Sequence, residues 1–293
     1  MNPSPIKWSR RAALAGGAAA AALPHPAAAE DLPWRLPKLR RVKVHGHSIA
    51  YFETGEGPPM MLAHGMSGSA AFEWGRVLTP LSRKFRVIAP YQIGFAPSDQ
   101  PDLAYDAATF VDFLGGFMHA RTAEGAILVG ESFGGWVAAR YALAQGGRSS
   151  WKQTLPPISG LVIVDGAVQA HPLPPKPPQA SINSPEVGKL AGAFFASQPK
   201  VDNSKVTKGA GAHVLAQQLT DAELRSIKTP TLVVWGAGDR LLPVSDGRHI
   251  ASEVPGARAV IIEDCGHIPS VEQPRAFLGA LGGFLGQPLE LLT

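Results

Sequence analysis

The sequence predicts an α/β fold with a mostly parallel, doubly wound sheet. Short apolar runs rich in β-branched residues, typical of buried strands, alternate along the chain with segments at helical spacing. Polar residues follow several of these runs, as they do at the carboxyl ends of parallel strands. The 293 residues, 45% of them hydrophobic, are enough for one large domain of this class.

The expected strands, of which the first two form a hairpin, cover residues 41–44, 48–52, 60–63, 85–90, 126–129, 161–165, 230–236 and 259–262. A helix is expected at 106–118, where Phe110, Phe113, Leu114 and Phe117 form one apolar stripe. Another is expected at 134–144, closed by glycines. Strands and helices therefore follow one another in the order that a parallel sheet needs.

One stretch, between the strands expected at 161–165 and 230–236, breaks this alternation. It opens with the proline-rich residues 171–178, which cannot form a helix or a central strand. Ser184 and Pro185 then indicate a helix start, a second short helix is expected at 212–219, and Thr220 is the expected cap of a third. The sequence therefore predicts a small helical insertion after the sixth strand.

The residues 130–134, Gly-Glu-Ser-Phe-Gly, join the strand at 126–129 directly to the following helix. Such a junction needs a sharp bend, and a glycine on each side lets the backbone pass closely. Ser132 lies at the apex. The backbone N–H of Phe133, in the first turn of the helix, would point at any negative charge that develops there.

A serine hydroxyl becomes a good nucleophile only when a base removes its proton. His267 lies in the loop after the last expected strand and is the candidate base. Asp239 lies in the glycine-rich turn after the strand at 230–236 and is the candidate acid that orients it. The three side chains thus follow three different strands.

These motifs together resemble the α/β-hydrolase superfamily, which reads G-x-S-x-G, then G-x-x-D, then G-H-x-x-x-x-E-x-P in this order. The resemblance implies an α/β-hydrolase fold, a Ser132, Asp239 and His267 triad, and a cap formed by the insertion at 171–226. Asp165, at the end of the strand at 161–165, is the alternative acid, because some members place their acid on that strand. The turn around Asp239 matches the commoner arrangement.

The resemblance also implies an oxyanion hole made by two backbone N–H groups, those of Met66 and Phe133. Met66 belongs to the His64-Gly65-Met66 loop, in which His64 is expected to have a structural role. Many relatives carry Asp where this chain has Tyr91 and Gly where it has Ala96, so we expect an altered loop there. The candidate pocket residues are Tyr91, Trp136, Phe194 and Phe195.

The N-terminal residues 1–29 predict a signal peptide. Arg10 and Arg11 precede an uncharged run rich in alanine and glycine, and 27–29 form a small-residue cleavage site. The paired arginines resemble a twin-arginine export signal, and the apolar run is too short to span a bilayer. We expect a periplasmic or secreted protein without a stable membrane anchor, with core segments at 30–170 and 227–293.

Composition excludes several other classes. Cleavage after Ala29 would remove three basic residues and lower the formal charge from +4 to +1, so the charge predicts no acidic partner. No basic patch with interleaved aromatic residues predicts nucleic-acid binding, and no histidine pair has metal-ligand spacing. The single cysteine, Cys265, precludes an intramolecular disulfide and is expected to pack in its loop. We expect no cofactor and a small-molecule substrate.

The expected reaction is hydrolysis of a carboxylic ester through an acyl-enzyme at Ser132. Dehalogenases and epoxide hydrolases of similar size carry Asp at this position, so the serine argues against both. Three alternatives use the same triad: hydrolysis of a C–C bond, hydrolysis of a lactone, and cofactor-free peroxidase chemistry. A fourth is a non-catalytic protein that binds a ligand under the cap.

Overall fold

The computed structural model describes residues 34–169 and 182–291. The predicted signal peptide and the proline-rich residues 171–178 lie outside the described residues. The strands are β1 (Arg40–Val44), β2 (His47–Thr54), β3 (Pro59–Ala63), β4 (Arg86–Pro90), β5 (Ala126–Glu131), β6 (Ile158–Val164), β7 (Thr231–Gly236) and β8 (Arg258–Ile262). The helices are α1 (Ala70–Leu81), α2 (Ala107–Ala120), α3 (Phe133–Ala144), α4 (Pro185–Ser197), α5 (Ser204–Ala216), α6 (Asp221–Ser226), α7 (Val244–Glu253), α8 (Pro269–Glu272) and α9 (Pro274–Leu285).

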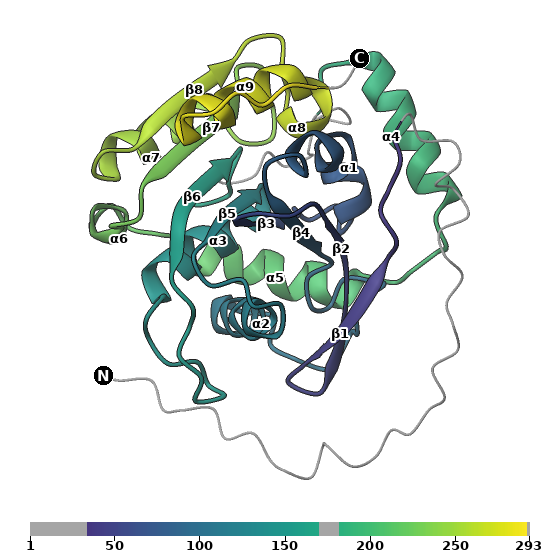
Figure 1. The fold of residues 1–293 in the computed structure, drawn as a ribbon, viewed down its shortest axis with the longest axis vertical. Coiled ribbons are helices and arrows are strands. Elements are labelled where there is room, and N and C mark those ends of the chain that lie inside the picture. Colours follow the sequence, from purple (N-terminus) through teal and green to yellow (C-terminus); the bar gives the residue numbers. More distant parts are fainter. Residues whose placement is uncertain (1–33, 170–181, 292–293) are drawn as a thin grey trace.

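The strands form one eight-stranded sheet in the order β1-β2-β4-β3-β5-β6-β7-β8 (Figure 1). Strand β2 pairs antiparallel with both β1 and β4, whereas the strands from β4 to β8 are parallel. The sequence prediction of a mostly parallel sheet that opens with a hairpin is therefore confirmed.

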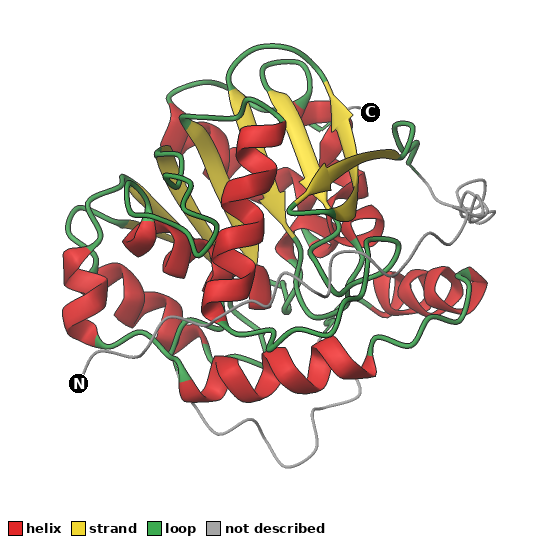
Figure 2. Ribbon diagram, turned by 90° about the horizontal axis from the view of Figure 1, so that it is seen from below, coloured by secondary structure: helices red, strands yellow, loops and turns green. Residues whose placement is uncertain are grey.

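Helices cover both faces of the sheet (Figure 2). Buried side chains of α2, α3, α5, α6 and α7 share one apolar cluster with one face of the strands. Those of α1, α4, α8 and α9 share a second cluster with the other face. Because β5 is buried along its whole length, it reads in the sequence as a continuous apolar run rather than an alternating one.

The sheet order places a switch point between β3 and β5. The chain leaves β3 through α1 on one face and leaves β5 through α3 on the other. In open parallel sheets, the crevice that binds ligands lies at the carboxyl ends of the strands at such a point. The loop after β3 and the turn after β5 meet here, which brings Gly65 and Ser132 together.

The insertion between β6 and β7 holds three helices, α4, α5 and α6. Ser184 caps α4 and Thr220 caps α6 in a capping box with Glu223, as the sequence predicts. The helix expected at 212–219 is wrong in its bounds, because α5 spans Ser204–Ala216. Two glycines within α5 weaken its helical signal, and burial of Val206, Ala210 and Val214 on the core stabilises it.

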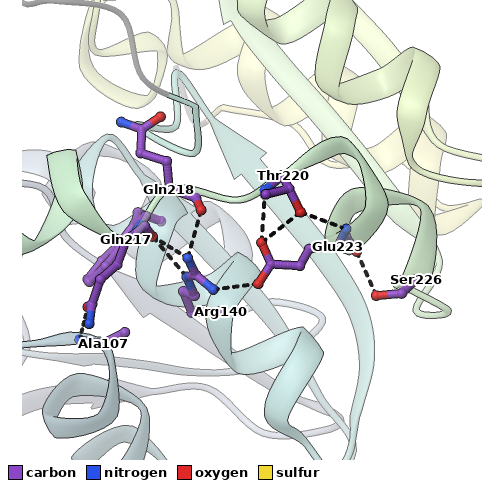
Figure 3. A network of polar contacts seen from close by, with 8 residues as sticks. Ala107, Arg140, Gln217, Gln218, Thr220, Glu223 and Ser226 are labelled. Carbon is purple, nitrogen blue, oxygen red and sulfur yellow. Dashed lines mark hydrogen bonds and ion pairs between the residues drawn. The ribbon is translucent and has the colours of Figure 1, made fainter. Parts of the chain in front are cut away.

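Arg140 of α3 fixes the end of this insertion to the core (Figure 3). Its guanidinium donates to the backbone carbonyls of Gln217 and Gln218 and to the Glu223 carboxylate, at 2.9 Å for the last of these. Trp136 Nε1 also donates to the Gln217 carbonyl, at 2.9 Å. The chain between α5 and α6 is thus held against the helix that begins at Ser132.

Within residues 34–169 and 182–291, no helix is both long enough and apolar enough to cross a lipid bilayer.

Packing around the turn after β5 predicts the effect of Gly134→Ala. A Cβ at Gly134 would lie 2.1 Å from the Ala63 carbonyl oxygen, so either backbone must move. We expect the free energy of unfolding to fall by about 1–3 kcal/mol, as for overpacked core sites. Urea denaturation measures this change.

Gly279→Ala in α9 is the matched control, because a Cβ there meets no atom within 4 Å. Alanine is the better helix former by about 0.5–1 kcal/mol, so this variant should be slightly more stable than the wild type. Equal unfolding midpoints for the two variants would contradict the close approach at Gly134.

Candidate active site

Ser132 occupies the sharp turn between β5 and α3. Its backbone has φ 54° and ψ −118°, a left-handed conformation that a residue with a side chain rarely adopts. A Cβ at Gly130 would lie 2.1 Å from the Gly134 carbonyl oxygen, so the turn leaves no room for side chains on either flank. This geometry aims the Ser132 side chain out of the sheet and leaves it partly accessible, while the residues beside it are buried.

Ser132, His267 and Asp239 form one hydrogen-bonded line. His267 Nδ1 lies 2.8 Å from Asp239 Oδ2, and His267 Nε2 lies 2.9 Å from Ser132 Oγ. A carboxylate only accepts hydrogen bonds, so Nδ1 carries the proton and Nε2 accepts from the serine hydroxyl. The structure therefore brings together the three residues that the sequence selects, in an arrangement able to remove the Ser132 proton.

The two candidate acids differ in charge. Burial raises the pKa of Asp239, but hydrogen bonds from His267 and neighbouring groups outweigh it, so this pKa lies below the ordinary value. Asp165 is fully buried, and burial with the nearby Asp239 raises its pKa well above the ordinary value. Its Oδ1 accepts the Gly236 N–H at 3.0 Å. Asp239 is thus the charged partner of His267, and Asp165 is a neutral acid behind it.

Backbone amides hold both the acid and the base. Asp239 Oδ1 accepts the N–H groups of Leu241 and Leu242, at 2.8 and 3.0 Å. The Glu272 carboxylate accepts the N–H groups of Gly266 and Ile268, which flank His267, at 3.1 and 3.2 Å. These bonds fix the orientation of each side chain before any substrate binds.

His64 is occupied within its own loop. Its Nδ1 donates to the Gly65 carbonyl at 2.8 Å, and its Nε2 accepts the Gln92 N–H at 2.9 Å. Burial lowers the pKa of His64 to about 4, so the ring is neutral. The Gln92 side chain donates in return to the His64 carbonyl at 2.7 Å. His64 thus joins the loop after β3 to the loop after β4, a structural arrangement like the one predicted.

Two glutamates are buried close to Ser132. Burial raises the pKa of Glu73 to about 7, although hydrogen bonds from Ser67 and Gly65 lower it. Burial raises the pKa of Glu131 well above its ordinary range, and the neighbouring carboxyl groups of Glu73, Glu272 and Asp239 raise it further. The charged neighbours that act on Glu131 are therefore all acids.

The four candidate pocket residues come from three segments: the loop after β4, α3 and α4. Trp136 is fully buried and Tyr91 is 6% exposed, with the Tyr91 ring packed between those of Phe52 and His64. The two residues on α4, Phe194 and Phe195, contact the Phe72 ring in tilted arrangements, with ring centroids 5.4 and 5.2 Å away. The Trp136 N–H donates to the Ser132 carbonyl at 3.3 Å in the first turn of α3. The contribution of the four side chains to a pocket stays a prediction. Met66 and Phe133 follow β3 and β5 as expected, and the role of their N–H groups also stays a prediction.

Two groups of side chains in the described part of the chain bring three potential metal ligands within 4.8 Å of one another. One consists of Asp165, Asp239 and His267, where both nitrogens of the histidine already take part in the hydrogen-bonded line. The other lies nearer the surface and consists of Asp221, His249 and Glu253. Cys265 is fully buried beside the histidine loop, and burial raises the pKa of its thiol, so it packs rather than reacts.

Sequence reasoning missed Gln92, Glu73 and Glu131 as parts of the site. A signal exists for the two glutamates, because each is the charged residue in a run that is otherwise apolar and buried, 70–75 for Glu73 and 126–131 for Glu131. Gln92 carries no such signal, since its partner, His64, comes from a distant part of the chain.

Comparisons with known proteins agree with the fold. Residues 60–280 match the family described as "Alpha/beta hydrolase family". The chain is 28% identical to 2-hydroxy-6-oxo-6-(2'-aminophenyl)hexa-2,4-dienoic acid hydrolase of Metapseudomonas resinovorans, over 86% of this chain and 92% of that protein.

Two solved structures are similar in fold. A meta-cleavage product hydrolase from Pseudomonas fluorescens superposes with a TM-score of 0.72 at 24% identity, over 84% of this chain and 97% of that one. An esterase from Rhodococcus sp. superposes with a TM-score of 0.67 at 26% identity, over 85% of this chain and 98% of that one.

The buried Glu131 predicts how stability depends on pH. Below about pH 4.5, its ordinary pKa, the carboxyl is protonated in both the folded and the unfolded chain. Above that pH the unfolded chain ionises first, so the folded protein loses stability, by at most about 1.4 kcal/mol per pH unit. Glu131→Gln mimics the neutral acid and should not lose this stability.

The measurement is the free energy of unfolding in urea at pH 4 and pH 7.5. We expect Glu131→Gln to match the wild type at pH 4 and to be more stable at pH 7.5. Glu263→Gln, at the surface, controls for the removal of one carboxyl group. If Glu131→Gln is less stable than the wild type by the same amount at both pH values, Glu131 is charged in the folded protein at pH 7.5.

Proposed function

Since the chain belongs to the alpha/beta hydrolase family, we propose that it is a serine hydrolase that cleaves neutral carboxylic esters through an acyl-enzyme at Ser132. The observation that carries this proposal is the Ser132, His267 and Asp239 line, with distances of 2.9 and 2.8 Å, on a strained turn. A nucleophile, a base and an orienting acid within hydrogen-bond reach are the components that acyl transfer requires.

In the proposed reaction, His267 takes the proton of Ser132 while Oγ attacks the carbonyl carbon of the ester. The carbonyl π electrons move to its oxygen, and the N–H groups of Met66 and Phe133 stabilise this oxyanion. The imidazolium, stabilised by the Asp239 carboxylate, then protonates the departing alcohol as the C–O bond breaks. Water, deprotonated by His267, then attacks the acyl-enzyme. The bond from the acyl carbon to Ser132 Oγ breaks, the imidazolium returns its proton to Oγ, and the carboxylic acid is released.

The region behind the Ser132 turn favours a neutral substrate. Burial raises the pKa of Glu131 and of Asp165 well above their ordinary values. A buried region that keeps its own acids protonated also disfavours a carboxylate on the substrate. An acyl group that carries its own carboxylate would therefore bind less well there than an uncharged ester or lactone.

The second candidate is hydrolysis of a C–C bond in a dienoic acid, which the name of the Metapseudomonas relative favours. The same triad can serve either reaction. The two candidates differ in the charge of the substrate, since a dienoic acid carries a carboxylate at neutral pH. The export of the protein, which rests on residues 1–29, is also a proposal.

The experiment compares p-nitrophenyl esters of neutral acids of increasing chain length with p-nitrophenyl half-esters of dicarboxylic acids, using the wild type and Ser132→Ala. We expect turnover of the neutral esters to depend on Ser132. For acyl chains of equal length, kcat/KM should be at least about tenfold lower for the half-esters, which corresponds to about 1.4 kcal/mol of unfavourable burial of their carboxylate.

Equal turnover by wild type and Ser132→Ala would contradict an acyl-enzyme at Ser132. Preference for the half-esters would favour the C–C hydrolase, and turnover of a 2-hydroxy-6-oxo-dienoate would then establish it. Binding of these compounds without turnover would favour a ligand-binding protein.

A further inference from the structure

Glu73 lies at a junction of the three loops that form the candidate site. It is 3% exposed and lies in the first turn of α1. Its carboxylate Oε2 accepts the Gly65 N–H at 2.6 Å, and its Oε1 accepts the Ser67 hydroxyl. Both partners belong to the loop after β3, on either side of Met66.

The same residue is tied to the other two loops through Ser270 of α8, just after His267. The Ser270 hydroxyl lies 2.7 Å from the Glu73 carbonyl oxygen and 2.8 Å from Glu131 Oε2. One hydroxyl carries one hydrogen, so both contacts are hydrogen bonds only if Glu131 is protonated and donates to Ser270. The chain of bonds then runs from Glu131, beside Ser132, through Ser270 to Glu73.

The loop that Glu73 holds lies against the nucleophile. A Cβ at Gly65 would be 3.0 Å from Ser132 Cβ and 3.5 Å from Glu73 Oε1. A shift of this loop by a few tenths of an ångström would therefore move the Met66 N–H relative to any group bonded to Ser132. Oxyanion donors act only from a fixed position. Such a shift therefore reduces the stabilisation of the transition state more than it reduces the binding of the substrate.

We propose that Glu73 is a positioning residue for the oxyanion loop: by accepting hydrogen bonds from Gly65 and Ser67, its carboxylate fixes the Met66 N–H where the oxyanion of the reaction forms. This proposal rests on the proposed function, because it assigns a role within acyl transfer at Ser132. Glu73 does not touch the reacting atoms. It acts through the backbone on both sides of Met66.

The test compares three variants on the best neutral ester. Glu73→Ala removes both hydrogen bonds and should lower kcat by about 100-fold, the effect of one oxyanion donor, with KM changed less than about threefold. Glu73→Gln keeps an acceptor for the Gly65 N–H and should retain kcat within about fivefold. Ser67→Ala removes one of the two hydrogen bonds, and its kcat should lie between those of Glu73→Ala and Glu73→Gln.

A second readout separates positioning from folding. The affinity for a trifluoromethyl ketone, which forms an oxyanion adduct with the serine, should fall in parallel with kcat across the three variants. The affinity for the product alcohol should stay constant. Glu53→Ala is the matched control, because the Glu53 side chain on β2 is also largely buried and accepts hydrogen bonds from Arg40 and Arg121, next to the start of β4 and away from the site. It should lower thermal stability and leave kcat unchanged.

The proposal is overturned if Glu73→Ala loses thermal stability as Glu53→Ala does but keeps kcat and ketone affinity. If Glu73→Ala does not fold, Ser67→Ala decides: unchanged kcat and ketone affinity would overturn the proposal as well. These results differ from failure of the proposed function, in which the wild type itself has no turnover that depends on Ser132.

Discussion

The site depends on one steric constraint, the close approach of three backbone segments around Ser132. The turn from β5 into α3 has no room for a side chain at Gly130 or Gly134, and the loop after β3 passes within contact distance at Gly65. These contacts force Ser132 into its left-handed conformation. They also bring the loop that contains Met66 close to Ser132, since a Cβ at Gly65 would lie 3.0 Å from Ser132 Cβ. The strain at the turn is compatible with stable folding because β5 is buried among its neighbours on both faces.

The charge distribution follows from how deeply each carboxyl is buried and from its partners. Asp239 receives three hydrogen bonds, from His267 and two backbone amides, and these stabilise its anion. Glu131 and Asp165 have fewer donors and lie beside other acids, so the proton stays on them. One acid of this group is therefore charged and faces the imidazole, while two neutral acids fill the space behind the turn. The same physics that selects Asp239 over Asp165 also disfavours an anionic acyl group near Ser132.

Much of this arrangement could be predicted from the sequence, because it depends on local signals. Continuous apolar runs locate the parallel strands, and glycines mark the turn at Ser132. Side chains that follow different parallel strands must meet at one edge of the sheet, which is why Ser132, Asp239 and His267 could be selected together. The contacts of Gln92 could not be foreseen, because its partner His64 lies 28 positions away in another loop. Those of Glu73 depend on how the loop after β3 folds back on α1, which sequence patterns do not show. The helix expected at 212–219 differs from α5 in its bounds. Tertiary packing at Val206 and Ala210 outweighs the weak helix propensity of the glycines in α5, and the sequence pattern does not show that packing.

The central claim is that Ser132 is the residue that becomes acylated, and covalent labelling tests it most directly. Diethyl p-nitrophenyl phosphate transfers its phosphoryl group to an activated serine and releases p-nitrophenolate. The account predicts that mass spectrometry finds one diethylphosphoryl group per chain, in the tryptic peptide 122–140 that contains Ser132, and none in Ser132→Ala. Absence of labelling in the wild type, or labelling of another residue in both proteins, would contradict it.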